Sequence, residues 1–266
     1  MSDTGESRDV AEPRPLRTRL GHALPDRVLV RGHDLTADLL GNITYTDMVS
    51  LMLLGRLPTE AERRMLDALL VVLVEHGLVK PVVAARFVYS NAPESLQAAV
   101  AASLLGAGSK HLGSSEWCAR MLQEAIGRES TDEEVAAAGE RVVEAFRERR
   151  ERIPGIGHRT HAAGDPRADR LFEIARETGT YGPYSALLER IAVVAGERAG
   201  RGLPVNVTGA IAAIASDMGF RWEITRAFAL IGRTLGALAH IQEEMDEPIS
   251  DALIERIRRD VEYETD

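Results

Sequence analysis

Residues 153–167 read IPGIGHRTHAAGDPR and separate two runs of helical pattern. Glycine adopts backbone angles closed to other residues and lets a ligand approach the main chain, whose exposed N–H groups can hold a phosphate. His158 in this stretch could donate a hydrogen bond to a developing oxyanion, and Arg167 could pair bidentately with a carboxylate or phosphate. The same residues also fit a plain connector that ends one helix and starts the next.

Two common phosphate-binding motifs do not describe this stretch. A P-loop needs Lys followed by Ser or Thr at a fixed distance from the first glycine, and that pair is missing here. A dinucleotide fingerprint follows a β-strand, and the pattern before residue 153 is helical. The stretch therefore points either to a site of another kind or to a structural loop.

Helical patterns dominate outward from this loop, from residue 36 to the C-terminus. Thr131 with Glu134 forms a capping box before an apolar run, and Thr59 is a predicted N-cap of a helix that closes at Gly77. The last long pattern, residues 222–244, predicts one buried stripe made of Ile224, Ala227, Phe228, Ile231, Leu235 and Leu238. The start and stop signals together predict an all-α protein of roughly ten helices.

Strand patterns are scarce. Only RVLVRG, residues 27–32, is typical of a strand, and it predicts a short hairpin arm. Aromatic residues make up 5% of the chain, which also favours helix over strand.

Composition excludes several classes of protein. The chain has 266 residues and a formal net charge of −9, so general nucleic-acid binding is not expected. One cysteine, Cys118, allows neither an internal disulfide nor a cysteine-based metal site, and we expect it to be a small buried residue. The histidines lack metal-ligand spacing, so no metal is predicted. No apolar run has the length of a membrane span, and the N-terminus lacks the core of a signal peptide, which fits a cytoplasmic protein.

Two further segments carry similar chemistry. In residues 106–117, GAGSKHLGSSEW, His111 stands between glycine-containing turns, and residues 203–214, LPVNVTGAIAAI, precede a helix that carries Arg233. A single histidine in such a position is more often structural than catalytic. His161 and His240 are also expected to be structural.

These segments together resemble the citrate synthase family. The family's PG-aromatic-GH loop and nearby DPR resemble PGIGHRTHAAGDPR, and its Asn-Val-Asp-Gly segment resembles NVTG at residues 206–209. LIGRTLGALAHIQEE at 230–244 is similar to the helix that follows, and residues 45–77 are similar to the N-terminal helices. The resemblance covers about residues 30–250 in the right order, and the shortness of the chain is closer to the citryl-CoA lyase branch.

The resemblance implies an all-α fold with a large and a small helical domain that close over a cleft between them, and a homodimer. Residues 1–18 would be a flexible tail. Residues 19–111 and 221–266 would form the large domain, and residues 112–220 the small one.

The resemblance also implies roles for individual residues. His111 would polarise the acyl-CoA thioester carbonyl, and His158 would bind the keto oxygen of oxaloacetate or the hydroxyl of citryl-CoA. Arg167 and Arg233 would bind substrate carboxylates. A coenzyme A thioester is implied as substrate, with no permanently bound cofactor. The implied coenzyme A contacts are Arg152, Pro154, Gly155, Ile156 and Gly157.

One departure from the family bears on the direction of the reaction. Thr208 stands where the family has the aspartate that takes the methyl proton of acetyl-CoA, and threonine is no base at neutral pH. Cleavage of citryl-CoA begins instead with the hydroxyl proton, so a lyase is the leading hypothesis. Asp217, nine residues further on, is expected at the other end of its helix. A condensing enzyme with another acyl-CoA or keto acid, and a non-catalytic CoA-binding or interaction protein, remain as alternatives.

Overall fold

The computed structural model describes residues 16–108, 113–157 and 164–264 of the chain. By contacts between residues the chain divides into two compact units, residues 1–57 and 58–266. No helix in the described ranges is long and apolar enough to cross a membrane.

The first unit holds a three-stranded antiparallel sheet and two short helical elements. Its strands are β1 (Gly21–Ala23), β2 (Val28–Val30) and β3 (His33–Asp34), paired in that order. The predicted hairpin at 27–32 is therefore present, and Arg31 and Gly32 make its turn with positive φ angles of 52° and 89°. A π-helical turn, η1 (Leu35–Leu39), leads to α1 (Tyr45–Leu54), which ends at Gly55 in the left-handed conformation.

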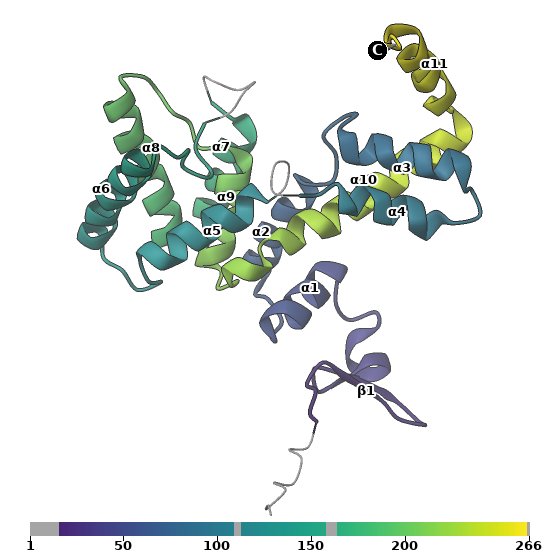
Figure 1. Cartoon of the computed structure of the whole chain (residues 1–266). Coiled ribbons are helices and arrows are strands. Elements are labelled where there is room, and N and C mark those ends of the chain that lie inside the picture. Colours follow the sequence, from purple (N-terminus) through teal and green to yellow (C-terminus); the bar gives the residue numbers. More distant parts are fainter. Residues whose placement is uncertain (1–15, 109–112, 158–163, 265–266) are drawn as a thin grey trace, which may run out of the picture. The chain divides into compact units, whose positions relative to one another are not determined.

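The second unit is helical throughout its described residues (Figure 1). Its elements are α2 (Glu60–Val71), α3 (Lys80–Asn91), α4 (Leu96–Leu105), α5 (Ser114–Ala125), α6 (Asp132–Arg149), α7 (Pro166–Glu177), α8 (Pro183–Ala199), α9 (Val207–Asp217), the 3₁₀ turn η2 (Trp222–Ile224), α10 (Arg226–Asp246) and α11 (Ser250–Asp260). The all-α prediction is confirmed. The predicted capping box at Thr131 forms, and the predicted N-cap Thr59 also forms one, with Glu62, because the residues that make each box lie within one turn of the chain.

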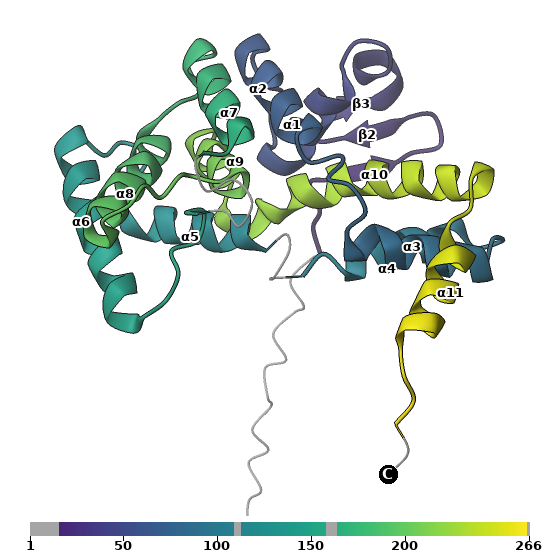
Figure 2. The same ribbon diagram turned by 90° about the horizontal axis from the view of Figure 1, so that it is seen from above.

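Helix α9 is the centre of one group of helices. It contacts α5, α7 and α8, and in Figures 1 and 2 it lies among them. Every residue from Gly209 to Ser216 is buried. These residues are mostly alanine and isoleucine, which suit a helix with neighbours on several sides because small side chains allow close approach. Cys118 of α5 is fully buried nearby, as predicted.

Helix α10 links this group to a second one. Its first residue, Arg226, is ion-paired to Glu116 of α5 at 2.9 Å, and further along α10 contacts α2, α3 and α4. Figure 2 shows α3 and α4 running beside the later part of α10. The predicted stripe on this helix is partly wrong, because Leu235 and Leu238 are 59% and 37% exposed. The buried face is built instead around two glycines, Gly232 and Gly236.

The close packing of α2 against α10 explains this difference. A Cβ at Gly232 would lie 3.0 Å from the Cβ of Leu73, and one at Gly236 would overlap the carbonyl oxygen of Val74. The prediction that the second helix runs to Gly77 is also wrong, because α2 ends at Val71. The six residues that follow turn across the surface of α10.

Candidate active site

Two of the predicted site residues lie outside the described residues. His111 falls in 109–112 and His158 in 158–163, so the predicted meeting of the two histidines stays a prediction. The other predicted residues belong to three described places: the loop at 152–157, the N-termini of α7 and α9, and the middle of α10.

The loop at 153–157 is joined to the segment before α9 by backbone pairing. Ile156 and Val205 form an antiparallel bridge, the N–H of Gly157 donates to the carbonyl of Pro204 at 2.7 Å, and the N–H of Asn206 donates to that of Gly155 at 2.9 Å. The side-chain amide of Asn206 adds a bond of 2.8 Å to the carbonyl of Gly157. Two of the segments that carried the family resemblance, some fifty residues apart, are thus held together.

The contact of Gly155 with α9 depends on the absence of a side chain. Gly155 has a φ of +85°, and a Cβ there would lie 2.7 Å from the sulfur of Cys118 and 2.9 Å from the Cα of Gly209. A Cβ at Gly209 would in turn lie 2.6 Å from the carbonyl oxygen of Gly155. Both glycines are therefore needed for the loop to reach the N-terminus of α9.

We expect Gly155→Ala to destabilise the fold by about 2–4 kcal/mol, since it combines overpacking with left-handed strain. Gly157→Ala is the matched control, because Gly157 has a similar φ of +79° and its Cβ would meet no atom within 4 Å. That variant should lose only about 1 kcal/mol. Urea unfolding of the wild type and both variants measures the difference, and equal losses would contradict the proposed close approach.

Asp165 connects the start of α7 to the start of α9. Its fully buried carboxylate accepts from Nε and Nη2 of Arg167, both at 2.9 Å, and from the N–H of Val207 at 2.9 Å. Burial alone would raise the pKa of Asp165, but the hydrogen bonds from Arg167 and Val207 outweigh it and lower the pKa. The carboxylate is therefore ionised at neutral pH and fixes the orientation of the Arg167 guanidinium.

Thr208 occupies the first turn of α9 and takes part in a chain of hydroxyl and amide groups. Ser114 Oγ donates to Thr208 Oγ1 at 2.9 Å, and Thr208 Oγ1 donates to Asn206 Oδ1 at 2.7 Å. Asn206 also caps α9 by accepting from the N–H of Gly209. This series of hydrogen-bonded side chains can hold or pass a proton, but it contains no group that is basic at neutral pH.

Asp217 does not supply a base for this position. It ends α9, nine residues or about 14 Å along the helix from Thr208. Its carboxylate accepts from the backbone N–H groups of Gly182, Tyr184 and Ser185 and so caps the start of α8. Burial raises its pKa although these hydrogen bonds oppose the change. Its expected place at the far end of the helix is confirmed.

Arg233 brings a second guanidinium into the neighbourhood of Arg167. Its side chain is partly buried, and its Nη1 atom is fully buried without a hydrogen-bond partner among the described residues. Burial lowers the pKa of Arg233, the charge of Glu75 opposes this, and the charge of Arg167 adds to it. Two cationic groups that act on each other, one with an unsatisfied donor, are the arrangement expected of a site for an anion with several carboxylates.

A cavity of about 560 Å³ lies on the other side of the loop. Of the predicted coenzyme A contacts, Arg152, Ile156 and Gly157 line it, whereas Pro154 and Gly155 do not. Three more arginines line it, Arg147, Arg198 and Arg201. The volume is in the usual range for a small-molecule site, and the guanidinium groups suit a ligand with phosphates.

Three residues that position the site were not predicted from the sequence. Asp165 could have been found, because an aspartate directly before a proline at a helix start is a common N-cap. Asn206 could have been found in the same way, since asparagine is also a preferred N-cap. Ser114 gave no signal, because it meets Thr208 from a distant part of the chain.

Comparisons with known proteins find similarity to one family over most of the chain. The family model described as citrate synthase, C-terminal domain, matches residues 26–258. The citrate synthase of Heyndrickxia coagulans is 27% identical over 216 residues, which is 77% of this chain and 53% of that protein. Citrate synthase 2 of Bacillus subtilis is 29% identical over 72% of this chain and 50% of that protein. The chain thus spans about half the length of the curated relatives it matches.

One solved structure matches over nearly its whole length. Citryl-CoA lyase from Hydrogenobacter thermophilus is 39% identical, with a TM-score of 0.84, over 95% of this chain and 96% of that one. ATP citrate lyase of Methanosaeta concilii in complex with (3S)-citryl-CoA has the same fold, with a TM-score of 0.71, at 21% identity over 97% of this chain and 43% of that one.

Proposed function

The chain belongs to the citrate synthase family, and from this premise we propose that it is a lyase that cleaves citryl-CoA to acetyl-CoA and oxaloacetate. The observation that carries the proposal is the match to a citryl-CoA lyase of nearly the same extent, since each chain covers almost all of the other. The citrate synthases it matches are about twice as long as the region they share with it.

The proposed reaction starts at the hydroxyl group of citryl-CoA. His158 accepts the hydroxyl proton, the new carbonyl of oxaloacetate forms, and the bond between the carbinol carbon and the acyl methylene breaks. The electron pair moves into the thioester as an enolate, whose oxygen His111 stabilises by a hydrogen bond. A proton from water then completes the methyl group of acetyl-CoA, and the proton held by His158 neutralises the hydroxide that remains.

The two arginines are proposed to hold the carboxylates through these steps. Asp165 fixes the fork of Arg167 through two hydrogen bonds, and Arg233 offers a buried donor without a partner. A guanidinium already held in place binds a carboxylate with little loss of side-chain entropy. The same two residues would serve oxaloacetate in the reverse reaction.

The absence of an aspartate at position 208 is less damaging to a lyase than to a condensing enzyme. Condensation must begin with removal of a methyl proton from acetyl-CoA, and the described neighbours of Thr208 are a hydroxyl and an amide. Cleavage needs a base only for the more acidic hydroxyl proton. The chain Ser114–Thr208–Asn206 can still hold a water that protonates the enolate.

Coenzyme A is the proposed occupant of the cavity beside the loop. The arginines at its edge would meet the phosphates, and the backbone of Ile156 and Gly157 would meet the adenine end. No permanently bound cofactor is needed, because the thioester itself provides the electron sink.

The remaining expectations about the whole protein are part of the same proposal. We keep the small domain at 112–220 and the large domain at 19–111 and 221–266 as a proposal. Within residues 58–264 it is supported by the contacts among α5–α9 and by those among α3, α4, α10 and α11. We expect a cytoplasmic homodimer. Exposed leucines on two helices that contact each other, Leu105 of α4 with Leu235 and Leu238 of α10, support an interface.

An assay in both directions tests the function directly. The proposal predicts release of oxaloacetate and acetyl-CoA in equal amounts from citryl-CoA, and much slower release of coenzyme A from acetyl-CoA plus oxaloacetate. Faster condensation would favour the synthase alternative. Binding of coenzyme A without turnover in either direction would favour a non-catalytic protein of the same fold.

Thr208→Asp should raise the rate of condensation by about 10- to 100-fold, because it puts a base beside the acyl methyl group. Exchange of acetyl-CoA methyl protons with deuterium from solvent, measured by mass spectrometry, should rise with it. Thr208→Asn is the matched control, since it has nearly the same shape and no basicity. If both variants exchange protons at the wild-type rate, Thr208 is not at the position of the base.

A further inference from the structure

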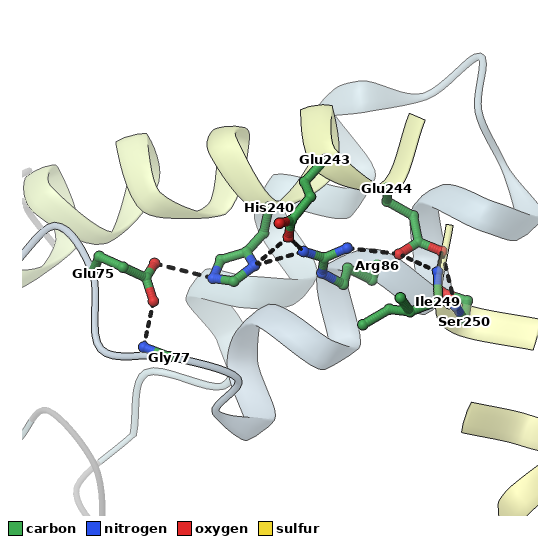
Figure 3. A network of polar contacts seen from close by, with 8 residues as sticks. All are labelled: Glu75, Gly77, Arg86, His240, Glu243, Glu244, Ile249 and Ser250. Carbon is green, nitrogen blue, oxygen red and sulfur yellow. Dashed lines mark hydrogen bonds and ion pairs between the residues drawn. The ribbon is translucent and has the colours of Figure 1, made fainter. Parts of the chain in front are cut away.

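A network of charged groups lies between α3 and α10, in the part of the molecule drawn in Figure 3. Arg86 of α3 is only 1% exposed. It donates from Nη1 to Glu244 at 2.8 Å, and its Nη2 pairs with Glu243 and contacts Nδ1 of His240 at 2.9 Å. Glu244 also accepts from the N–H groups of Ile249 and Ser250, so one end of the network is tied to the start of α11.

The other end of the network is Glu75. A guanidinium can only donate, so Nδ1 of His240 accepts from Arg86 and the ring hydrogen sits on Nε2. Nε2 lies 3.0 Å from Oε2 of Glu75 and therefore donates to it. The second oxygen of Glu75 accepts from the N–H groups of His76 and Gly77. Both oxygens are engaged, so the carboxylate has a fixed position and orientation (Figure 3).

That position lies against α10, about one helical turn along the helix from the arginine of the candidate site. A Cβ at Gly236 would lie 3.6 Å from Oε2 of Glu75, and Gly236 is one helical turn from Arg233 in one direction and from His240 in the other. Glu75 attracts the charge of Arg233, but no ion pair joins the two within the described ranges. The hydrogen bond from His240 holds the carboxylate near Gly236 and His240.

We infer that Glu75 is the fixed counter-charge of the carboxylate site around Arg233, and that His240, backed by Arg86, prevents it from closing an ion pair with that arginine. Glu75 and His240 are thus positioning residues for the substrate-binding step, and the inference rests on the proposed function of Arg233. Without a substrate, Arg233 and Arg167 repel each other, and Glu75 offsets part of that repulsion.

This arrangement makes two opposite predictions for substitutions at neighbouring positions. Glu75→Gln keeps the shape of the side chain and removes its charge, so the site should bind oxaloacetate about three- to tenfold more tightly. His240→Asn leaves Glu75 charged, but the asparagine side chain is too short to hydrogen-bond to it. Glu75 should then turn to Arg233 and weaken the binding of oxaloacetate by a similar factor. In the double variant the charge is gone, and oxaloacetate affinity should return to that of Glu75→Gln.

The experiment is isothermal titration of the full chain with oxaloacetate, and separately with coenzyme A, at 20 mM and 300 mM salt. The effect of Glu75→Gln on oxaloacetate should shrink at high salt, and coenzyme A affinity should not change. Glu243→Gln is the matched control, because Glu243 belongs to the same network but lies ten residues, about 15 Å, along α10 from Arg233. It should leave oxaloacetate affinity unaltered.

The outcomes separate the inference from the proposed function. A wild type that binds no oxaloacetate refutes both. If the wild type binds oxaloacetate and Glu75→Gln binds it equally well or more weakly, the counter-charge role of Glu75 is refuted and the proposed function is not. Weaker binding by His240→Asn that persists in the double variant would mean that the histidine acts on packing, and would refute its role in holding Glu75.

Discussion

Replacing Arg233 by methionine is expected to lower kcat/KM for citryl-CoA by about 10³-fold. Methionine keeps much of the buried volume of the side chain but removes every donor and the charge. The buried Nη1 of Arg233 has no partner among the described residues, so its hydrogen bond to a substrate carboxylate would be a charged one formed in a partly desolvated place. Losing such a bond, together with the electrostatic attraction, is worth about 4 kcal/mol, which corresponds to the stated factor.

Arg226→Met controls for the loss of an arginine from the same helix. Arg226 is ion-paired to Glu116 and is 30% exposed, so its loss should change kcat/KM less than threefold. Steady-state release of oxaloacetate measures both variants, and thermal unfolding checks that each is folded. A folded Arg233→Met variant within fivefold of the wild type would show that the guanidinium holds no substrate group.

The second large effect is expected at His158. His158→Ala removes the proposed acceptor of the hydroxyl proton, and general base catalysis by a histidine contributes about 10²- to 10⁴-fold. We expect kcat for citryl-CoA cleavage to fall by about 10³-fold, with a smaller change in KM, since the carboxylates and coenzyme A bind elsewhere. Oxaloacetate release during single and multiple turnovers measures the loss.

His161→Ala is the matched control, because His161 lies three residues further along the same segment and is expected to be structural. It should keep most of the wild-type kcat. If His158→Ala retained more than a tenth of the wild-type kcat, the hydroxyl proton would have another acceptor.

The sequence predicted those features of the fold that depend on neighbouring residues. The N-cap at Thr59 and the capping box at Thr131 each arise within one helical turn, so a local pattern is enough. The predicted end of α2 and the predicted buried face of α10 were wrong. They depend on the close approach of the end of α2 and the residues after it to Gly232 and Gly236, and a glycine in a helix gives no sign of what will pack on it.

The same division holds for the candidate site. Arg167 and Arg233 were predicted from the family resemblance, and each acts on the charge of the other although 66 positions separate them in the sequence. The contact of Arg86 with His240 and Glu244 could not be predicted from sequence spacing, because the partners are 154 and 158 positions apart. His240, expected to be a plain structural residue, belongs to the network that holds the carboxylate of Glu75.

A crystal structure of the chain with coenzyme A and oxaloacetate is the most direct test of the proposed chemistry. The prediction is that the carboxylates of oxaloacetate meet Arg167 and Arg233, and that a ring nitrogen of His158 lies within hydrogen-bond distance of the keto oxygen. His111 should point at the thioester end of coenzyme A, whose phosphates meet the arginines of the cavity beside the loop. If His111 and His158 lie on separate surfaces with neither ligand between them, the proposed lyase is wrong.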